Sequence, residues 1–198
     1  MKTKTYNVYS FAELSGPACQ RAIDAHRQFI AEQWDGETVI EDAQRVLAFA
    51  GLTVDKVFYS GFSSQGDGAC FEGSWHASGV RPDLMRAECP VDSVLHRIAD
   101  GFAKLAALYP NASFTVKHSG HYYHQYCTEF CVSIVDANCD EIADTGTAEA
   151  DLIELARDAM EWIYRQLEKE YDYQTAEAQV VESIEANDYE FTKDGRID

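Results

Sequence analysis

The chain has 198 residues, is 46% hydrophobic and carries a formal net charge of -18. This length fits one domain, or one domain with a small appendage. No run of about 18 apolar residues is present, which excludes a transmembrane helix, and the first residues lack the apolar stretch of a signal peptide. We therefore expect a cytoplasmic protein with no membrane partner, whose six cysteines are free thiols.

The charge is unevenly distributed along the chain. Residues 1–128 hold 14 acids and 11 bases, a net of -3, whereas residues 129–198 hold 20 acids and 5 bases, a net of -15. Such a field repels nucleic acid and attracts basic surfaces. We therefore predict no direct nucleic-acid binding and a partner, a protein or ribonucleoprotein complex, with a basic surface. The alternative explanation is that the negative charge only keeps the protein soluble.

The first part of the chain predicts a strand followed by two helices. Residues 4–9 alternate as a strand does. Pro17 suits the first turn of a helix that runs to about Gln33. A second helix begins near Thr38, which has capping-box spacing with a glutamate, and Gly51 suits its C-terminal cap.

The middle of the chain predicts a hairpin and a further helix. Residues 54–62 and 69–77 are rich in Val, Phe and Tyr and form two strands around a glycine-rich loop. Residues 78–89 have no clear periodicity and are expected to be irregular. A helix is predicted from Pro90 to just before Pro110.

A dense polar and aromatic stretch, residues 112–135, predicts a second hairpin with its turn at Ser119-Gly120. In a strand, alternate residues share a face. One face is predicted to be polar or covered: His121, Tyr123, Gln125, Cys127, Glu129 and Cys131. The other becomes apolar toward Ile134 and is predicted to face the core: Tyr122, His124, Tyr126, Thr128, Phe130, Val132 and Ile134.

The C-terminal part predicts helices. A long helix is expected from about Thr147 to Tyr171 and a short one over residues 174–186, with a tail that adds an edge strand or frays. The strands come in hairpin pairs, without alternating β and α crossovers. We therefore predict an α+β fold with a mainly antiparallel sheet packed by about five α-helices on one face. It forms a single domain, 1–198, with an acidic helical part at about 147–198.

Metal binding and nucleophilic catalysis are weakly supported. His121, Cys127 and Cys131 share a predicted strand face, but the two cysteines would lie about 13 Å apart by strand rise. A nucleophilic thiol would need a neighbouring base and acid, and Cys127, His121 and Glu129 supply these residue types without a specific motif. We therefore assign no catalytic residue, metal or cofactor, and do not expect an enzyme.

The glycine-rich loop, residues 61–68, resembles a phosphate-binding loop only superficially. It lacks the lysine of a P-loop, and a strand rather than a helix follows it. A structural turn is the simpler interpretation. The alternative is an enzyme or a ligand- or metal-binding protein, with its pocket between residues 63–68 of this loop and the turn at residues 118–124. Its candidate residues are Ser64, Gln65, Asp67, His118, His121, Tyr122 and His124.

The long C-terminal helix offers a candidate partner-binding surface. At helical spacing it presents an acidic stripe that could mimic DNA toward a basic groove. Basic residues at Arg157, Arg165 and Lys169 would partly neutralise it. The predicted partner-binding residues are Glu154, Asp158, Glu161, Glu168 and Asp172.

Three motifs together resemble a family of small acidic proteins of bacteriophages and mobile elements, mostly of unknown function and loosely labelled antitoxins. These motifs are YNVYSFAELS at residues 6–15, SGFSSQGDGACFEG at 60–73, and HSGHYYHQYC at 118–127 followed by WIYRQLEKEY at 162–171. The resemblance implies a phage-type protein that acts on its host.

Within that setting the leading hypothesis is an anti-CRISPR or anti-restriction inhibitor that binds a host defence complex in the host cytoplasm. It would act by steric or charge-mimicking occlusion. An antitoxin that neutralises a basic toxin is the alternative, and the charge argument does not separate the two.

Overall fold

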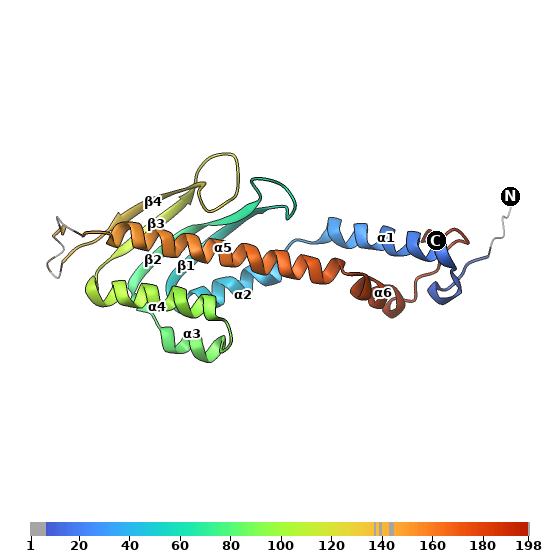
Figure 1. Ribbon diagram of the computed structural model, residues 1–198, viewed down its shortest axis with the longest axis horizontal. Coiled ribbons are helices and arrows are strands. Elements are labelled where there is room, and N and C mark those ends of the chain that lie inside the picture. The colour runs from blue at the N-terminus through green and yellow to red at the C-terminus, as the bar shows by residue number, and fades with distance from the viewer. Residues whose placement is uncertain (1–6, 137, 139, 143–144, 198) are drawn as a thin grey trace, which may run out of the picture. The chain divides into compact units, whose positions relative to one another are not determined.

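A four-stranded antiparallel sheet organises the computed structural model, which describes residues 7–136, 138, 140–142 and 145–197. Its strands follow the chain order, as Figure 1 shows. They are β1 (Ala50–Ser60), β2 (Gly68–Val80), β3 (Ser113–His118) and β4 (Thr128–Ser133). With six α-helices in the described part of the chain, this confirms the predicted α+β class and its mainly antiparallel sheet.

The chain folds into two compact units. The larger comprises Glu37–Glu168, and the smaller combines the chain up to Gly36 with the chain from Lys169 onward. The long helix α5 (Ala148–Thr175) contributes its residues up to Glu168 to the larger unit. Each unit has its own buried apolar side chains.

One face of the sheet is buried, and β2 shows this most clearly. Its odd-numbered residues from Ala69 to Ala77 are buried, whereas His76 and Ser78 are exposed. The fully buried ring of Trp75 stacks on Phe114 of β3, with ring centroids 5.8 Å apart. It also stacks on Phe102, at 5.1 Å, so the helix carrying Phe102 covers this face.

That helix is α4 (Ser93–Leu108), and it packs against α5. A Cβ on Gly101 would lie 2.5 Å from a methyl carbon of Leu155, so the absence of a side chain allows the close approach of the helices. The carboxylate of Asp92 caps α4 by accepting the N–H groups of Val94 and Leu95, both at 3.0 Å. The helix thus begins three residues after the predicted start at Pro90.

Two further predictions about the larger unit are wrong. Helix α2 (Glu37–Leu47) ends early, and Gly51 is part of β1 instead of a helix cap. Its φ is +83°, and a Cβ would lie 2.8 Å from the carbonyl oxygen of His76, so glycine is required inside the hairpin. Residues 78–89 are not irregular, because β2 continues to Val80 and α3 (Pro82–Glu88) follows.

The smaller unit contains a short 3-10 helix, η1 (Phe11–Glu13), with α1 (Gly16–Gln33) and α6 (Glu177–Ala186). Its buried cluster comprises Ala22, Ile23, Val180, Ile184 and Phe191. Of the predicted strand at 4–9, residues 4–6 lie outside the described part. Tyr9 forms an antiparallel bridge with Phe191, with two N–H···O bonds of 2.8 Å.

Candidate functional site

The connection between β3 and β4 is a loop, and the predicted tight turn at Ser119-Gly120 is wrong. Strand β3 ends at His118 and β4 begins at Thr128, so residues 119–127 form what we call the tyrosine loop. The N–H of Ser119 donates to the carbonyl of Cys127 at 2.9 Å and closes the loop. The predicted strand faces therefore do not exist over residues 121–127, although β4 itself alternates between half-buried and exposed residues as predicted.

The loop between β1 and β2, residues 61–67, is held by one carboxylate. An oxygen of Asp67 accepts the N–H groups of Ser63, at 3.0 Å, and Ser64, at 2.6 Å. The carboxylate therefore replaces the hydrogen-bond partners that these backbone groups would have in a strand. Ser64 and Gln65 are exposed at the tip of this loop, which we call the glycine loop.

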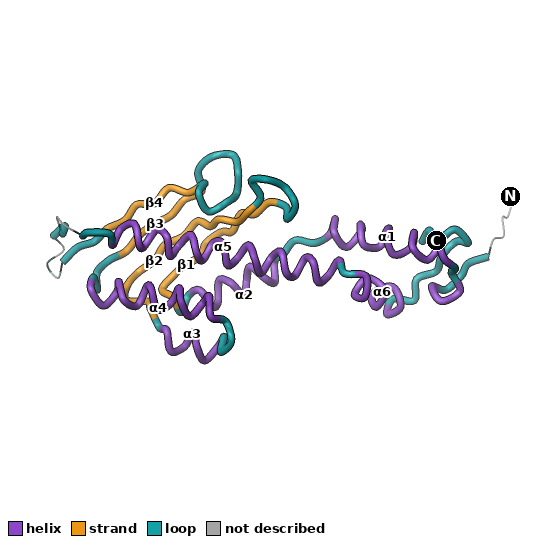
Figure 2. Tube along the Cα trace, viewed as in Figure 1, coloured by secondary structure: helices purple, strands orange, loops and turns teal. Residues whose placement is uncertain are grey.

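The two loops lie in contact at one end of the sheet. A Cβ on Gly66 would lie 3.6 Å from the ring of Tyr122, and a Cβ on Gly68 would lie only 2.6 Å from the Cβ of His124. Figure 2 shows both loops, in teal, beside one another. Gly66 of the glycine loop and Gly68 at the start of β2 thus make room for Tyr122 and His124 of the tyrosine loop.

His118, the last residue of β3, contacts the tyrosine loop through its ring and through one ring nitrogen. Its ring stacks on Phe58 of β1, with centroids 4.8 Å apart, and lies 5.2 Å from the ring of Tyr123. Its Nε2 lies 3.0 Å from the carbonyl oxygen of Tyr122, within hydrogen-bond distance. His118 therefore fixes the loop backbone, whereas His121 is exposed beside the ring of Tyr122.

His124 also contacts groups of its own loop. Its Nδ1 accepts the N–H of Tyr126 at 3.2 Å, and its Nε2 lies 3.4 Å from the Sγ of Cys127. The residue paired with Cys127 is thus His124 and not His121. Glu129, the third member of the predicted nucleophilic set, instead accepts the hydroxyl of Ser119 at 2.7 Å.

A second thiol lies buried in this region. Cys70 of β2 is fully buried, and burial, with smaller effects of Cys127 and Glu72, raises its pKa to about 12. A thiol with this pKa stays protonated at neutral pH and is a poor nucleophile. Over the described ranges, no three His, Cys, Asp or Glu side chains gather as the ligands of a metal ion would.

The predicted acidic stripe of α5 is largely ion-paired. Glu154 pairs with Arg157 at 2.6 Å, and Glu161 and Glu168 both pair with Arg165, at 2.8 and 2.7 Å. Asp158 pairs with Arg97 of α4 at 2.5 Å, and Asp172 is exposed in the smaller unit. The paired carboxylates remain between 29% and 62% exposed, so their charge still reaches solvent.

Helix α5 contacts both loops. The guanidinium of Arg157 lies over the ring of Tyr126, 4.9 Å from its centroid. The hydroxyl of Tyr164 donates to the carbonyl of Gly61 at 3.0 Å, and its ring lies 5.7 Å from that of Phe62. The acidic stripe and the tyrosine loop, two separate candidates in the sequence, therefore border one another.

We call this combined region the acidic-aromatic surface. It comprises Tyr122 and Tyr126 of the tyrosine loop with Glu154, Arg157 and Glu161 of α5, whereas Tyr164 of the same helix is buried. Tyr126, Arg157 and Tyr164 are not among the candidate residues predicted from the sequence. Helical spacing places Arg157 and Tyr164 beside the acidic stripe, so the sequence could have indicated them. Their contacts with loops that are distant in the chain could not be predicted from that spacing.

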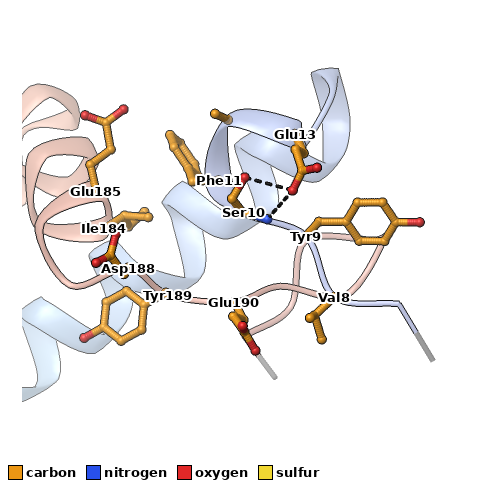
Figure 3. A pocket seen from close by; sticks show the side chains of 11 residues that line it. Val8, Tyr9, Ser10, Phe11, Glu13, Ile184, Glu185, Asp188, Tyr189 and Glu190 are labelled. Atoms are coloured by element: carbon orange, nitrogen blue, oxygen red, sulfur yellow. Dashed lines mark hydrogen bonds between the residues drawn. The ribbon is translucent and has the colours of Figure 1, made fainter. Parts of the chain in front are cut away.

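The smaller unit contains a separate pocket of about 440 Å³ between residues 8–13 and 184–190. In Figure 3, Glu13 accepts hydrogen bonds from Ser10 N–H, at 2.8 Å, and Ser10 Oγ, at 2.9 Å, which lower its pKa. Among the described residues, the lining combines aromatic and acidic side chains without a lysine or arginine. These side chains are Tyr9, Phe11, Glu13, Glu185, Asp188, Tyr189 and Glu190.

The fold and the surface define a class: an acidic α+β domain whose antiparallel sheet carries two contacting loops beside an ion-paired helix. Residues 34–177 match the model of a domain of unknown function (DUF8835), and the chain belongs to that family. The match includes the whole of the larger unit. No curated protein and no solved structure matches this chain. None of the described helices is long and apolar enough to cross a membrane.

Proposed function

We propose that this protein is a phage-type inhibitor that binds a basic, nucleic-acid-binding surface of a host defence complex and occludes it. The observation that carries the proposal is the charge: 15 of the 18 net negative charges lie in residues 129–198. The phage setting rests on the sequence resemblance alone.

The helices of this region remain strongly acidic after their own basic residues are counted. Helix α5 carries eight acidic and three basic residues, a net of -5, and α6 carries three acidic residues and no basic one. A field of one sign accelerates encounter with a surface of the opposite sign and repels free nucleic acid. A basic groove that normally holds nucleic acid is therefore the favoured target.

The internal ion pairs of α5 are compatible with this role. The pairs of Arg157 and Arg165 are at least partly exposed, and exposed ion pairs contribute only about 0–1 kcal/mol each. A partner's cations can replace the internal arginine at small cost. The internal pairs then hold the carboxylates in position until a partner binds.

Affinity capture with matched variants tests the proposal. The double variant Glu154→Gln and Glu161→Gln removes two charges from the acidic-aromatic surface. The control, Glu41→Gln and Asp83→Asn, removes two charges from exposed positions on α2 and α3. The wild type and the control should capture the same nucleic-acid-binding complex from host lysate, and the α5 variant should retain much less of it.

The captured complex should dissociate as salt rises, because screening weakens exposed charge pairs. It should also lose its ability to bind DNA or RNA while the inhibitor is bound. Equal capture by all three proteins, or a captured complex that still binds nucleic acid, would contradict the proposal. Capture of a basic toxin instead would favour the antitoxin function.

A further inference from the structure

We infer that Tyr122 and Tyr126 form a site for arginine side chains of the partner, and that this site prefers arginine to lysine. The inference rests on the proposed function, because it specifies the partner chemistry of the same surface. Nothing in the charge pattern alone requires it, since carboxylates attract both cations.

The first observation is the exposure of large rings. Tyr122 is 57% exposed and Tyr126 is 63% exposed, although both belong to one short loop. Aromatic side chains contribute large contact areas at interfaces, and tyrosine and arginine are enriched where binding energy is concentrated. Neighbouring exposed rings on one loop therefore indicate a contact surface.

The second observation is that the loop is held in place before any partner arrives. The ring of Tyr122 lies against Gly66, and its carbonyl oxygen lies within hydrogen-bond distance of His118 Nε2. The N–H of Tyr126 donates to His124. Fixing the rings in advance reduces the entropy that binding would otherwise cost.

The third observation is that rings in this region already hold cations of the chain itself. The guanidinium of Arg157 lies 4.9 Å from the ring centroid of Tyr126, and the ammonium of Lys56 lies 4.3 Å from that of Phe58. Arg157 also donates to the carboxylate of Glu154 at 2.6 Å. One arginine thus already uses a ring face together with a carboxylate in this surface.

A partner's arginine can use the same combination on the exposed side of the loop. A planar guanidinium stacks on an aromatic ring and still donates to a carboxylate in its plane, whereas a lysine ammonium is a hydrated point charge. The net charge of -18 favours a cationic occupant. Nucleobases also stack on tyrosine, but their phosphates would be repelled by this charge.

Fluorescently labelled nona-arginine and nona-lysine peptides of equal length and charge provide the probes. Four proteins are compared by fluorescence anisotropy: wild type, Tyr122→Ala with Tyr126→Ala, Tyr122→Phe with Tyr126→Phe, and Tyr173→Ala. Tyr173 is a matched control, because it is 54% exposed on α5 but belongs to the smaller unit. Circular dichroism and thermal unfolding verify that each variant is folded.

We expect wild type to bind nona-arginine more tightly than nona-lysine. The double alanine variant should weaken arginine binding about 5- to 30-fold, as the loss of two cation–π contacts requires, and should abolish the preference. The phenylalanine variant and Tyr173→Ala should behave as wild type does.

Equal binding of the two peptides by wild type, or an unchanged arginine affinity in the double alanine variant, would overturn the inference. The proposed function would survive that result, provided that both peptides still bind in a salt-dependent manner. Binding of neither peptide would contradict both. Preferential binding of a single-stranded oligonucleotide that the double alanine variant loses would also overturn the arginine site.

Discussion

The guanidinium of Arg157 on α5 lies over the ring of Tyr126 in the tyrosine loop, 4.9 Å from its centroid. Its Nε is buried and has no hydrogen-bond partner in the described part of the chain. The side chain is therefore held by Tyr126 and by its ion pair with Glu154. This contact joins the acidic helix to the tyrosine loop and makes the two one surface.

The first prediction concerns the close contact between Gly68 of β2 and His124 of the tyrosine loop. In Gly68→Ala the new Cβ would meet the Cβ and Cα of His124 at 2.6 and 2.9 Å, so the loop backbone must move. We expect a loss of about 1–3 kcal/mol of unfolding free energy and faster hydrogen exchange in both the glycine loop and residues 119–127. Urea unfolding and hydrogen-exchange mass spectrometry measure the two effects.

Gly120→Ala is the matched control. Unlike Gly68, Gly120 adopts a positive φ, +102°, and a Cβ there would meet nothing within 4 Å. Its cost should be the backbone strain alone, roughly 1 kcal/mol, with the glycine loop unaffected. If both variants loosened the glycine loop to the same degree, the contact between Gly68 and His124 would not hold the loops together.

A second prediction concerns Asp92, which links α4 to α5. One carboxylate oxygen accepts the N–H groups of Val94 and Leu95, and the other accepts the indole N–H of Trp162 at 2.9 Å. Asp92→Ala removes the helix cap and the bond to Trp162, so it should cost about 2 kcal/mol of unfolding free energy. Asp92→Asn keeps one acceptor oxygen and should cost clearly less. Equal losses in urea unfolding would show that the hydrogen bonds contribute little.

The third prediction is acid sensitivity of the smaller unit. His26 is 2% exposed, bonds Ser183 through Nε2 at 3.0 Å, and has an Nδ1 without a partner in the described residues. Burial lowers its pKa from the ordinary value of 6.5. The unfolded chain therefore takes up a proton at a higher pH than the folded chain does. The contribution of neutral His26 to the stability of the smaller unit is therefore complete above about pH 6.5 and is lost as the pH falls below that value.

Hydrogen exchange in α1 and α6 between pH 8 and pH 5, corrected for the intrinsic exchange rate, measures this effect. His26→Gln retains a group that can bond Ser183 but cannot titrate, and it should lose the pH dependence over this range. A variant whose protection falls with pH as steeply as that of wild type would assign the acid sensitivity to other groups.

The fourth prediction concerns thiol reactivity. Cys131 is exposed on β4, whereas Cys70 is fully buried with a pKa raised to about 12. Iodoacetamide at pH 8 should modify Cys131 rapidly and Cys70 only after unfolding, because alkylation requires an accessible thiolate. Peptide mass spectrometry with and without urea distinguishes the sites. Rapid modification of Cys70 in the folded protein would contradict its burial.

Much of the fold could be predicted from the sequence, because it depends on local periodicity. The alternating residues of β2 and the apolar stripes of α4 and α5 indicated the hairpin and the helices. Gly51 departs from its predicted role for a physical reason. A glycine after a helical pattern suits a cap, but here a backbone carbonyl of the partner strand demands it.

The candidate site was predictable in composition but not in geometry. The sequence placed histidines and tyrosines between His118 and Cys127, but their alternation resembles a strand, whereas hydrogen bonds within the segment fold it into a loop. The ion pair of Asp158 with Arg97 joins residues 61 positions apart, so it was not readable from helical spacing. The pocket between residues 8–13 and 184–190 was missed for the same reason.

Competition with nucleic acid is the decisive test of occlusion by this surface. The captured partner complex is loaded with fluorescent DNA or RNA and titrated with wild type, with Glu154→Gln plus Glu161→Gln, and with Glu41→Gln plus Asp83→Asn. We expect wild type and the control to displace the nucleic acid, and the α5 variant to do so only at a clearly higher midpoint concentration. Nucleic acid that stays bound while the protein is also bound would contradict occlusion of a basic groove by this surface.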